Sequence, residues 1–329
     1  MQHNARMTRP GGRRDQVLAL IRHSDAPLDD DQIAQAVQMN RVYVNAICRQ
    51  LAEDKLIVRN RSGAGKLVNS APCSSGLGQH AGITPDSSVE SRSWRGPRRR
   101  AADRMAERIH QLTAEFAGCV ATFEANQAFP GPSVYFHVRA IQRRRAHRTV
   151  DSLLEDDLFL EYVYAVLPAW GMHRMGRQAA KVGDFTPITA ALREKAPELQ
   201  QLWPLHITML SGQGASEAAA IAWDVIAHVK VSTSQTQIVA GSKFLHHLLP
   251  DLVPPMDRQY TFTFFTGQKM VPSDRAAFLD WFPRLAEVGG QCRDQIQAAI
   301  DRGGFMATGE AKVIDNAIMG FMQRRSGLT

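Results

Sequence analysis

Residues 239–260 read VAGSKFLHHLLPDLVPPMDRQY, and we expect the larger part of the chain to be organised around this stretch. Apolar side chains at helical spacing follow Gly241 and Lys243, and Pro250 ends that run. Because proline cannot continue a helix and restricts the residue before it, the pattern predicts a helix that ends near Leu249. A stiff loop follows, and a new helix is expected to begin at Asp257. The segment would therefore hold a lysine and a carboxylate in one rigid helix–loop–helix unit.

Helical patterns continue on both sides of this unit. Apolar residues recur every three to four positions, which is typical of amphipathic helices. An alternating strand pattern is not found after residue 70. We therefore predict an all-α domain of eight to ten helices over residues 98–329. The other helical segments are 98–120, 133–148, 151–167, 188–203, 215–231, 272–282, 290–300 and 312–323.

Residues 1–69 carry a different pattern, so that the predicted fold is mainly α with a small α/β domain at the start. Helical segments cover 16–23 and 31–37, and a third helix after Asn40 would turn Val44 and Leu51 inward. Two strand segments, 56–59 and 66–69, flank a turn rich in glycine and serine.

Three helices followed by a hairpin resemble a winged helix-turn-helix domain. The resemblance implies that the third helix enters the major groove of duplex DNA and that the hairpin touches the backbone. Arginine and asparagine suit the edges of guanine and adenine. The alternative is a winged helix that binds a protein partner. The implied DNA contacts are Arg41, Tyr43, Asn45 and Arg49 on the helix, with Arg61 and Lys66 in the wing.

Residues 70–97 separate the two domains and are rich in serine, glycine and proline. This composition buries too little apolar surface to offset chain entropy. We predict a flexible linker that lets both domains engage one duplex.

The charge balance favours a polyanionic partner. The net charge is +7 and the sequence pI about 9.5. Arginines gather over 92–108 and 139–148, and arginine suits phosphate better than lysine does. The alternative is that these runs are solvated helix faces. The phosphate contacts predicted in the second domain are Arg98, Arg99, Arg100, Arg143, Arg144 and Arg145.

Several classes of protein are disfavoured. Hydrophobic residues make up 44% of the chain, but no apolar run approaches the ~18 residues of a membrane span. The first residues lack the apolar core of a secretory signal, so we expect a cytoplasmic protein. The four cysteines are far apart, which argues against zinc sites and disulfides. A P-loop and a dinucleotide fingerprint are also missing, and neither cofactor nor metal is predicted.

The second domain resembles an uncharacterised family of all-helical bacterial and archaeal proteins. The stretches that carry this resemblance are PSVYFH at 132–137, WGMHRMG at 170–176, GSKFLHHLLPDLVPPMDRQYT at 241–261 and KVIDN at 312–316. The resemblance implies a helical domain and no particular activity.

A weaker similarity links Gly241, Lys243 and Asp257 to DNA glycosylases of the helix-hairpin-helix class. It implies that Lys243 attacks a sugar carbon and that Asp257 stabilises the cationic sugar. Tyr135, Phe136 or Trp170 would stack on an extruded base. The chain departs from that family, because Ile238 and Val239 stand where its proline and first glycine belong. The alternatives are a phosphate-binding or surface lysine and a helix-capping aspartate.

Three functions follow from these patterns. The first is a DNA-binding protein with a winged helix and a basic helical domain. The second is a DNA glycosylase or lyase that uses Lys243 and Asp257. The third is a transcriptional regulator whose helical domain senses a ligand or a protein partner.

Overall fold

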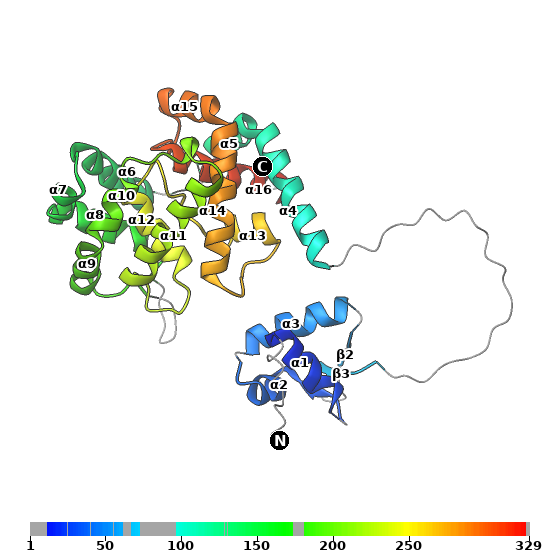
Figure 1. Cartoon of the computed structure of the whole chain (residues 1–329). Coiled ribbons are helices and arrows are strands. Elements are labelled where there is room, and N and C mark those ends of the chain that lie inside the picture. Colours follow the sequence, from blue (N-terminus) through cyan, green and yellow to red (C-terminus); the bar gives the residue numbers. More distant parts are fainter. Residues whose placement is uncertain are drawn as a thin grey trace, which may run out of the picture. The chain divides into compact units, whose positions relative to one another are not determined.

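The computed structural model describes residues 12–24, 26–39, 41–54, 56–61, 67–72, 97–127, 129, 131–173 and 181–326. The chain forms two compact units, Met1–Ser91 and Arg92–Thr329 (Figure 1). The division falls inside the predicted linker 70–97, most of which lies outside the described residues.

The first unit combines three helices with a small sheet. Its elements are α1 (Arg13–Arg22), β1 (Leu28–Asp29), α2 (Asp30–Ala36), α3 (Arg41–Glu53), β2 (Val58–Arg61) and β3 (Leu67–Ser70). The strands are antiparallel in the order β1-β3-β2, with Asn60 opposite Val68. The two-residue strand β1 was not predicted, because it is too short for an alternating pattern. Asp29 starts α2 through a capping box with Gln32.

A buried carboxylate ties the helices of this unit to its sheet. Asp30 is 5% exposed and accepts hydrogen bonds from Arg59 of β2 at 2.6 Å and from Asn69 of β3 at 3.0 Å. Asn45 of α3 donates to the same side chain at 2.5 Å. These charge-assisted bonds fix α3 against the sheet, because each donor comes from a different element.

The second unit is helical, with thirteen α-helices and one 3-10 helix in the part that the structure describes. The first helices are α4 (Pro97–Ala114), α5 (Phe116–Asn126), α6 (Gly131–Ala146), α7 (Val150–Leu154), α8 (Asp157–Ala169), α9 (Phe185–Glu194), α10 (Ala196–Leu202), η1 (Ile207–Met209) and α11 (Gly212–Val229). The last are α12 (Ile238–Leu248), α13 (Thr261–Thr266), α14 (Asp274–Gln291), α15 (Arg293–Asp301) and α16 (Glu310–Ser326). None of the described helices is long and apolar enough to cross a membrane.

The helices outnumber the eight to ten predicted, because several long patterns are divided. The segment 98–120 breaks at Glu115, and the segment 188–203 breaks at Lys195. A third break, at Glu155 and Asp156, separates α7 from α8, and the Asp156 side chain caps α8. Apolar periodicity does not register such breaks when both halves face the same core.

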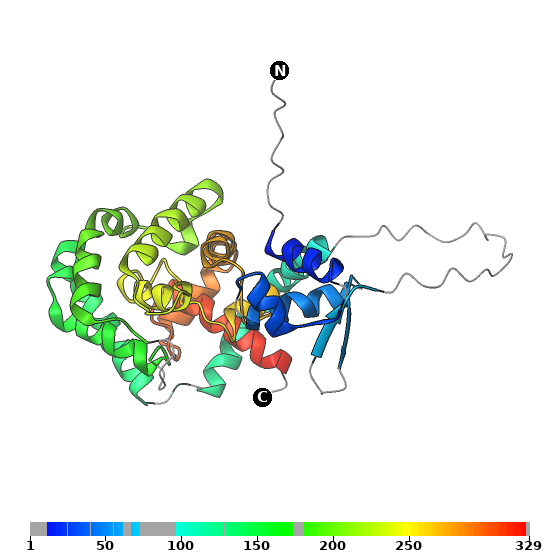
Figure 2. The ribbon, with the colours of Figure 1, turned by 90° about the horizontal axis from the view of Figure 1, so that it is seen from below.

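Helix α12 lies inside the second unit, with α6, α8, α11 and α14 packed around it (Figures 1 and 2). Ten of its eleven residues are buried, and Lys243 is the exception. Gly241 belongs to the first turn of this helix and not to a hairpin. A Cβ at Gly241 would overlap Cγ2 of Ile226 on α11, so glycine is required by helix packing.

Helices α5 and α16 also approach closely, at Gly320. A Cβ at this position would overlap the carbonyl oxygen of Cys119 on α5. The overlap involves backbone, which cannot move away as a flexible side chain can. Gly320 therefore sets the distance between the two helices.

We expect Gly320→Ala to lower the free energy of unfolding by more than about 2 kcal/mol, because an overpacked backbone contact must separate the helices. Urea unfolding followed by circular dichroism measures the loss. Gly290→Ala on α14 is the matched control, since Gly290 is exposed and its Cβ would lie 3.7 Å from the nearest atom. Equal stability of the two variants would contradict the close approach of α5 and α16.

Candidate functional site

The second unit contains a cavity of about 580 Å³. Its wall comes from the start of α12, the loop after it, helix α16 and the end of α8. Polar and aromatic side chains share this wall. The lining residues used below are Phe129, Trp170, Lys243, Asp257, Arg258, Tyr260, Lys269, Lys312 and Asp315.

Lys243 and Asp257, the two residues predicted for chemistry, line this one cavity. The Lys243 ammonium lies 3.5 Å from the carbonyl oxygen of Trp170 and 5.7 Å from the centre of its ring. Asp257 Oδ1 accepts a hydrogen bond of 2.6 Å from the Tyr260 backbone N–H. The carboxylate therefore holds the turn before α13 and faces the cavity as well. The new helix begins at Thr261, four residues later than expected.

A second lysine–aspartate pair, to which no role was assigned from the sequence, lines the same cavity. Lys312 and Asp315 lie on α16 and are 1% and 5% exposed. Lys312 Nζ donates to Asp315 Oδ2 at 2.7 Å and to Asn316 Oδ1 at 2.5 Å. The stretch KVIDN was recognised from the sequence, but its spacing alone did not indicate a buried pair.

The pKa values of two groups that line the cavity, Asp315 and Tyr260, are shifted by their surroundings. Burial raises the pKa of Asp315, and the nearby Asp257 carboxylate acts in the same direction, while Lys312 and Lys243 oppose it. Burial also raises the pKa of Tyr260, again with help from Asp257. Asp257, Asp315, Lys243 and Lys312 are therefore within electrostatic reach of one another.

Three buried histidines, His137, His246 and His247, form a cluster next to Lys243. His247 Nδ1 faces the Lys243 carbonyl oxygen at 2.7 Å, and because a carbonyl only accepts, this nitrogen carries the proton. His247 Nε2 then accepts from His137 Nδ1 at 3.0 Å, and His137 Nε2 accepts from the Thr308 hydroxyl at 2.6 Å. With both rings neutral, every nitrogen in this chain of bonds has a partner. The chain of bonds fixes the backbone of α12 at Lys243.

Burial lowers the pKa of each of these histidines. For His247 the pKa falls to about 4, and the Lys312 and Lys243 charges contribute. His137 and His246 shift in the same direction, with the neighbouring imidazoles as the next cause. The centre of the Trp170 indole lies 5.2 Å from the centre of the His137 ring and 5.1 Å from the centre of the His247 ring. The cluster therefore also supports the cavity wall.

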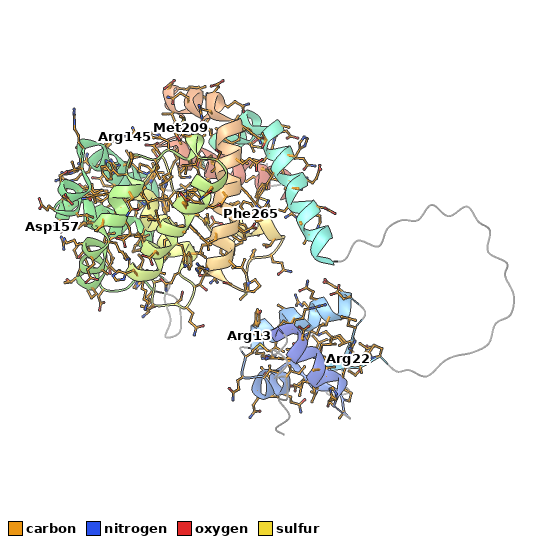
Figure 3. All side chains as sticks on the ribbon, viewed as in Figure 1. Arg13, Arg22, Arg145, Asp157, Met209 and Phe265 are labelled. Atoms are coloured by element: carbon orange, nitrogen blue, oxygen red, sulfur yellow. The ribbon has the colours of Figure 1, made fainter. Side chains whose placement is uncertain are left out.

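The arginines of α6 were predicted to bind phosphate, and the structure gives each of them an internal partner. Arg143 forms an ion pair of 2.5 Å with Asp156. Arg144 donates to the Leu248 carbonyl oxygen at 2.6 Å and lies 3.3 Å from the centre of the Trp203 ring. Arg145 is exposed (Figure 3) and donates to the Thr308 carbonyl oxygen at 3.1 Å.

Arg143 and Arg145 are exposed, whereas Arg144 is half-buried. Burial lowers the pKa of Arg144 to about 10, as expected for a guanidinium that serves as packing. The side chains of Arg98, Arg99 and Arg100 lie outside the described residues, and so do the Arg61 side chain and all of Lys66.

The residues predicted on the third helix are divided between surface and interior. Arg41 and Arg49 are exposed, and Arg41 pairs with Asp31 at 3.1 Å. Tyr43 is half-buried against the core of the first unit. Asn45 was expected on the exposed face, but it is half-buried and its amide is bonded to Asp30.

Of the aromatic residues proposed to stack on a base, Trp170 lines the cavity. Tyr135 and Phe136 do not line it, and Tyr135 is 57% exposed on α6. Phe129 was not predicted, but it lies 6.4 Å from Trp170 and contributes a second ring to the wall.

The arrangement suits acid–base or amine chemistry on a ligand with negative charge and a flat ring. The charged lining residues are four cations and two carboxylates, Lys243, Arg258, Lys269, Lys312, Asp257 and Asp315. Among the described residues there is no group of histidine, cysteine, aspartate or glutamate that could hold a metal ion.

We expect the histidine cluster to make the protein less stable in acid. The unfolded histidines bind protons near pH 6.5, whereas folded His247 does so only near pH 4. The free energy of unfolding therefore falls below pH 6.5, by about 1.4 kcal/mol per pH unit for each such histidine. Urea unfolding between pH 7.5 and pH 5 measures this slope.

His247→Gln should make the slope shallower, although it also lowers stability at pH 7.5. His110→Gln is the control, because His110 is exposed on α4. A slope unchanged by His247→Gln would mean that this ring is not held neutral by the fold.

Comparisons of the chain with protein-family models, with curated proteins and with solved structures gave no match. The resemblances drawn from the sequence therefore stay predictions.

Proposed function

We propose that this is a DNA-binding protein whose first unit is a winged helix that grips duplex DNA and whose second unit engages a nucleotide in its cavity. The observation that carries the proposal is the architecture of the first unit. Its elements run α1, β1, α2, α3, β2, β3, and β3 lies between the other strands. This order is typical of winged helices and supports α3 as the helix that enters the major groove.

The surface of α3 supports the same reading. Arg41 and Arg49 are its exposed cations, while Val44 and Leu51 fill the core. Asn45 is bonded to Asp30, so we assign it to fixing the helix and not to base readout. Arg49 is thus the strongest candidate for a contact with base or phosphate.

Arg49→Ala should weaken duplex affinity roughly tenfold. If Arg49 contacts phosphate, the slope of log affinity against log salt also becomes less steep by about one. Fluorescence anisotropy with a labelled duplex at several salt concentrations measures both quantities.

Arg22→Ala is the matched control for this measurement. It removes the same charge from the same unit, at the exposed end of α1 (Figure 3). Equal affinity of Arg49→Ala and the unaltered protein at moderate salt would refute the groove assignment of α3.

A second candidate function is a DNA glycosylase or lyase, and one specific observation favours it. Lys243 and Asp257 line one cavity together with Trp170. A volume of about 580 Å³ lies in the range of ligand sites and suits an extruded nucleotide. The charged lining disfavours an apolar ligand in this cavity, and a regulator that senses a ligand or a protein partner stays the third candidate.

In this reading Lys243 is the amine nucleophile. It attacks C1′ of a deoxyribose, and Asp257 stabilises the positive charge that develops there. The ring of Trp170 would stack on the base or cover the sugar. Lys269 and Arg258 are exposed at the cavity and suit a flanking phosphate.

The lyase reading predicts a covalent adduct between the protein and an abasic-site duplex when borohydride is present. Lys243→Ala should abolish the adduct, because no other amine would have the same position. Gel electrophoresis of the denatured complex detects it. Lys269→Ala, which removes an exposed amine from the same cavity, is the control and should keep it. Trapping that persists in Lys243→Ala would assign the chemistry to another amine.

A further inference from the structure

The stretch KVIDN at 312–316 supplies the most deeply buried charges of the cavity, and the functions proposed above give it no role. Lys312 and Asp315 are both almost fully enclosed by protein, yet both line the cavity. Burying two charges costs free energy that their mutual attraction only partly returns. Such a pair beside a cavity is a candidate for function.

The Lys312 ammonium is held by two hydrogen bonds and two aromatic rings. It donates to Asp315 and Asn316, and it lies 5.2 Å and 5.8 Å from the ring centres of Phe123 and Phe129. The Asn316 amide in turn donates to the Met306 carbonyl oxygen at 3.2 Å. A lysine fixed in this way does not swing toward a ligand. Its role is to position Asp315.

Asp315 and Asp257 differ in their surroundings, although they share the cavity. Asp257 is half-buried and accepts the Tyr260 backbone N–H. Asp315 is buried, and the groups that face it are Lys312, Asp257, Lys243 and Tyr260. Burial and the Asp257 charge raise the pKa of Asp315 in spite of the two lysines. Two carboxyl groups separated in this way can act as an acid and a base.

We propose that Asp315, positioned by Lys312, is the proton donor for the reaction of Lys243 with an aldehyde sugar in this cavity. This inference rests on the proposed lyase function. The Lys243 ammonium first releases a proton to solvent, and the neutral amine adds to C1′ of the open-chain aldehyde. A carbon–nitrogen bond forms, the carbon–oxygen double bond becomes a single bond, and a proton of the amine passes to the sugar oxygen. The product is a carbinolamine.

Asp315 acts in the next step. Its carboxyl proton passes to the carbinolamine hydroxyl, the carbon–oxygen bond breaks, and water leaves. The nitrogen lone pair completes the carbon–nitrogen double bond. Asp315 is left as a carboxylate beside the iminium cation, which it stabilises by charge.

The test is single-turnover trapping with an abasic-site duplex and cyanoborohydride, between pH 5 and pH 9. The reductant transfers hydride to the iminium carbon, so the trapped fraction reports iminium formation. Asp315→Asn should slow trapping roughly 100-fold, because a positioned acid contributes about that factor. Its amide oxygen can still accept from Lys312, which preserves the pair. Asp301→Asn, at an exposed site on α15, is the control and should trap at the normal rate.

The pH dependence separates proton donation from a structural role. The rate of the unaltered protein should fall at high pH as Asp315 loses its proton, and Asp315→Asn should lack this fall. A urea unfolding transition of Asp315→Asn that matches that of the unaltered protein shows that the second unit is folded. If that variant does not fold, the absence of a descending limb in the unaltered protein still overturns the inference.

The outcomes also separate this inference from the proposed lyase function. Trapping by the unaltered protein, with Asp315→Asn equally fast, overturns the role of Asp315 and leaves the lyase function standing. No adduct with the unaltered protein refutes the lyase function, and the role of Asp315 fails with it.

Discussion

The enclosure of α12 is the constraint on which the second unit depends. Helices pack around it on several sides, and Gly241 lets α11 approach its first turn. Every residue of α12 except Lys243 is buried. The backbone therefore decides where the ammonium lies, and the histidine chain from Thr308 reinforces that position. After Pro250 the chain turns, and the stiff segment through Pro255 brings Asp257 to the same cavity.

The charges inside this cavity are better explained by chemistry than by stability. An isolated buried ion pair contributes little net free energy, and an apolar replacement is often as stable. Lys312 and Asp315 are nevertheless buried together, with Asn316 as a further partner. The buried neutral histidines also lower the free energy of unfolding in acid, because the unfolded chain binds protons that the folded rings do not. Under the proposed lyase function, these groups serve the chemistry in the cavity.

The sequence predicted the parts of the site that lie close together in the chain. Proline and helical spacing located the end of α12, whereas the next helix begins at Thr261 and not at Asp257 as predicted. Contacts over long separations were not predictable. His137 meets His247 across 110 positions, and no local pattern indicates this. For the arginines of α6, composition shows that charge is present, whereas packing decides which guanidinium groups stay in solvent. Arg144 covers Trp203 instead.

The packing of these arginines bears on which of the two units supplies affinity for DNA. Arg144 of α6 is packed on a tryptophan, whereas Arg143 and Arg145 are exposed and can add contacts with a duplex. Under the proposed function the first unit supplies affinity through Arg41 and Arg49. The cavity can consequently bind its nucleotide weakly, and its buried charges can be arranged for chemistry and not for affinity.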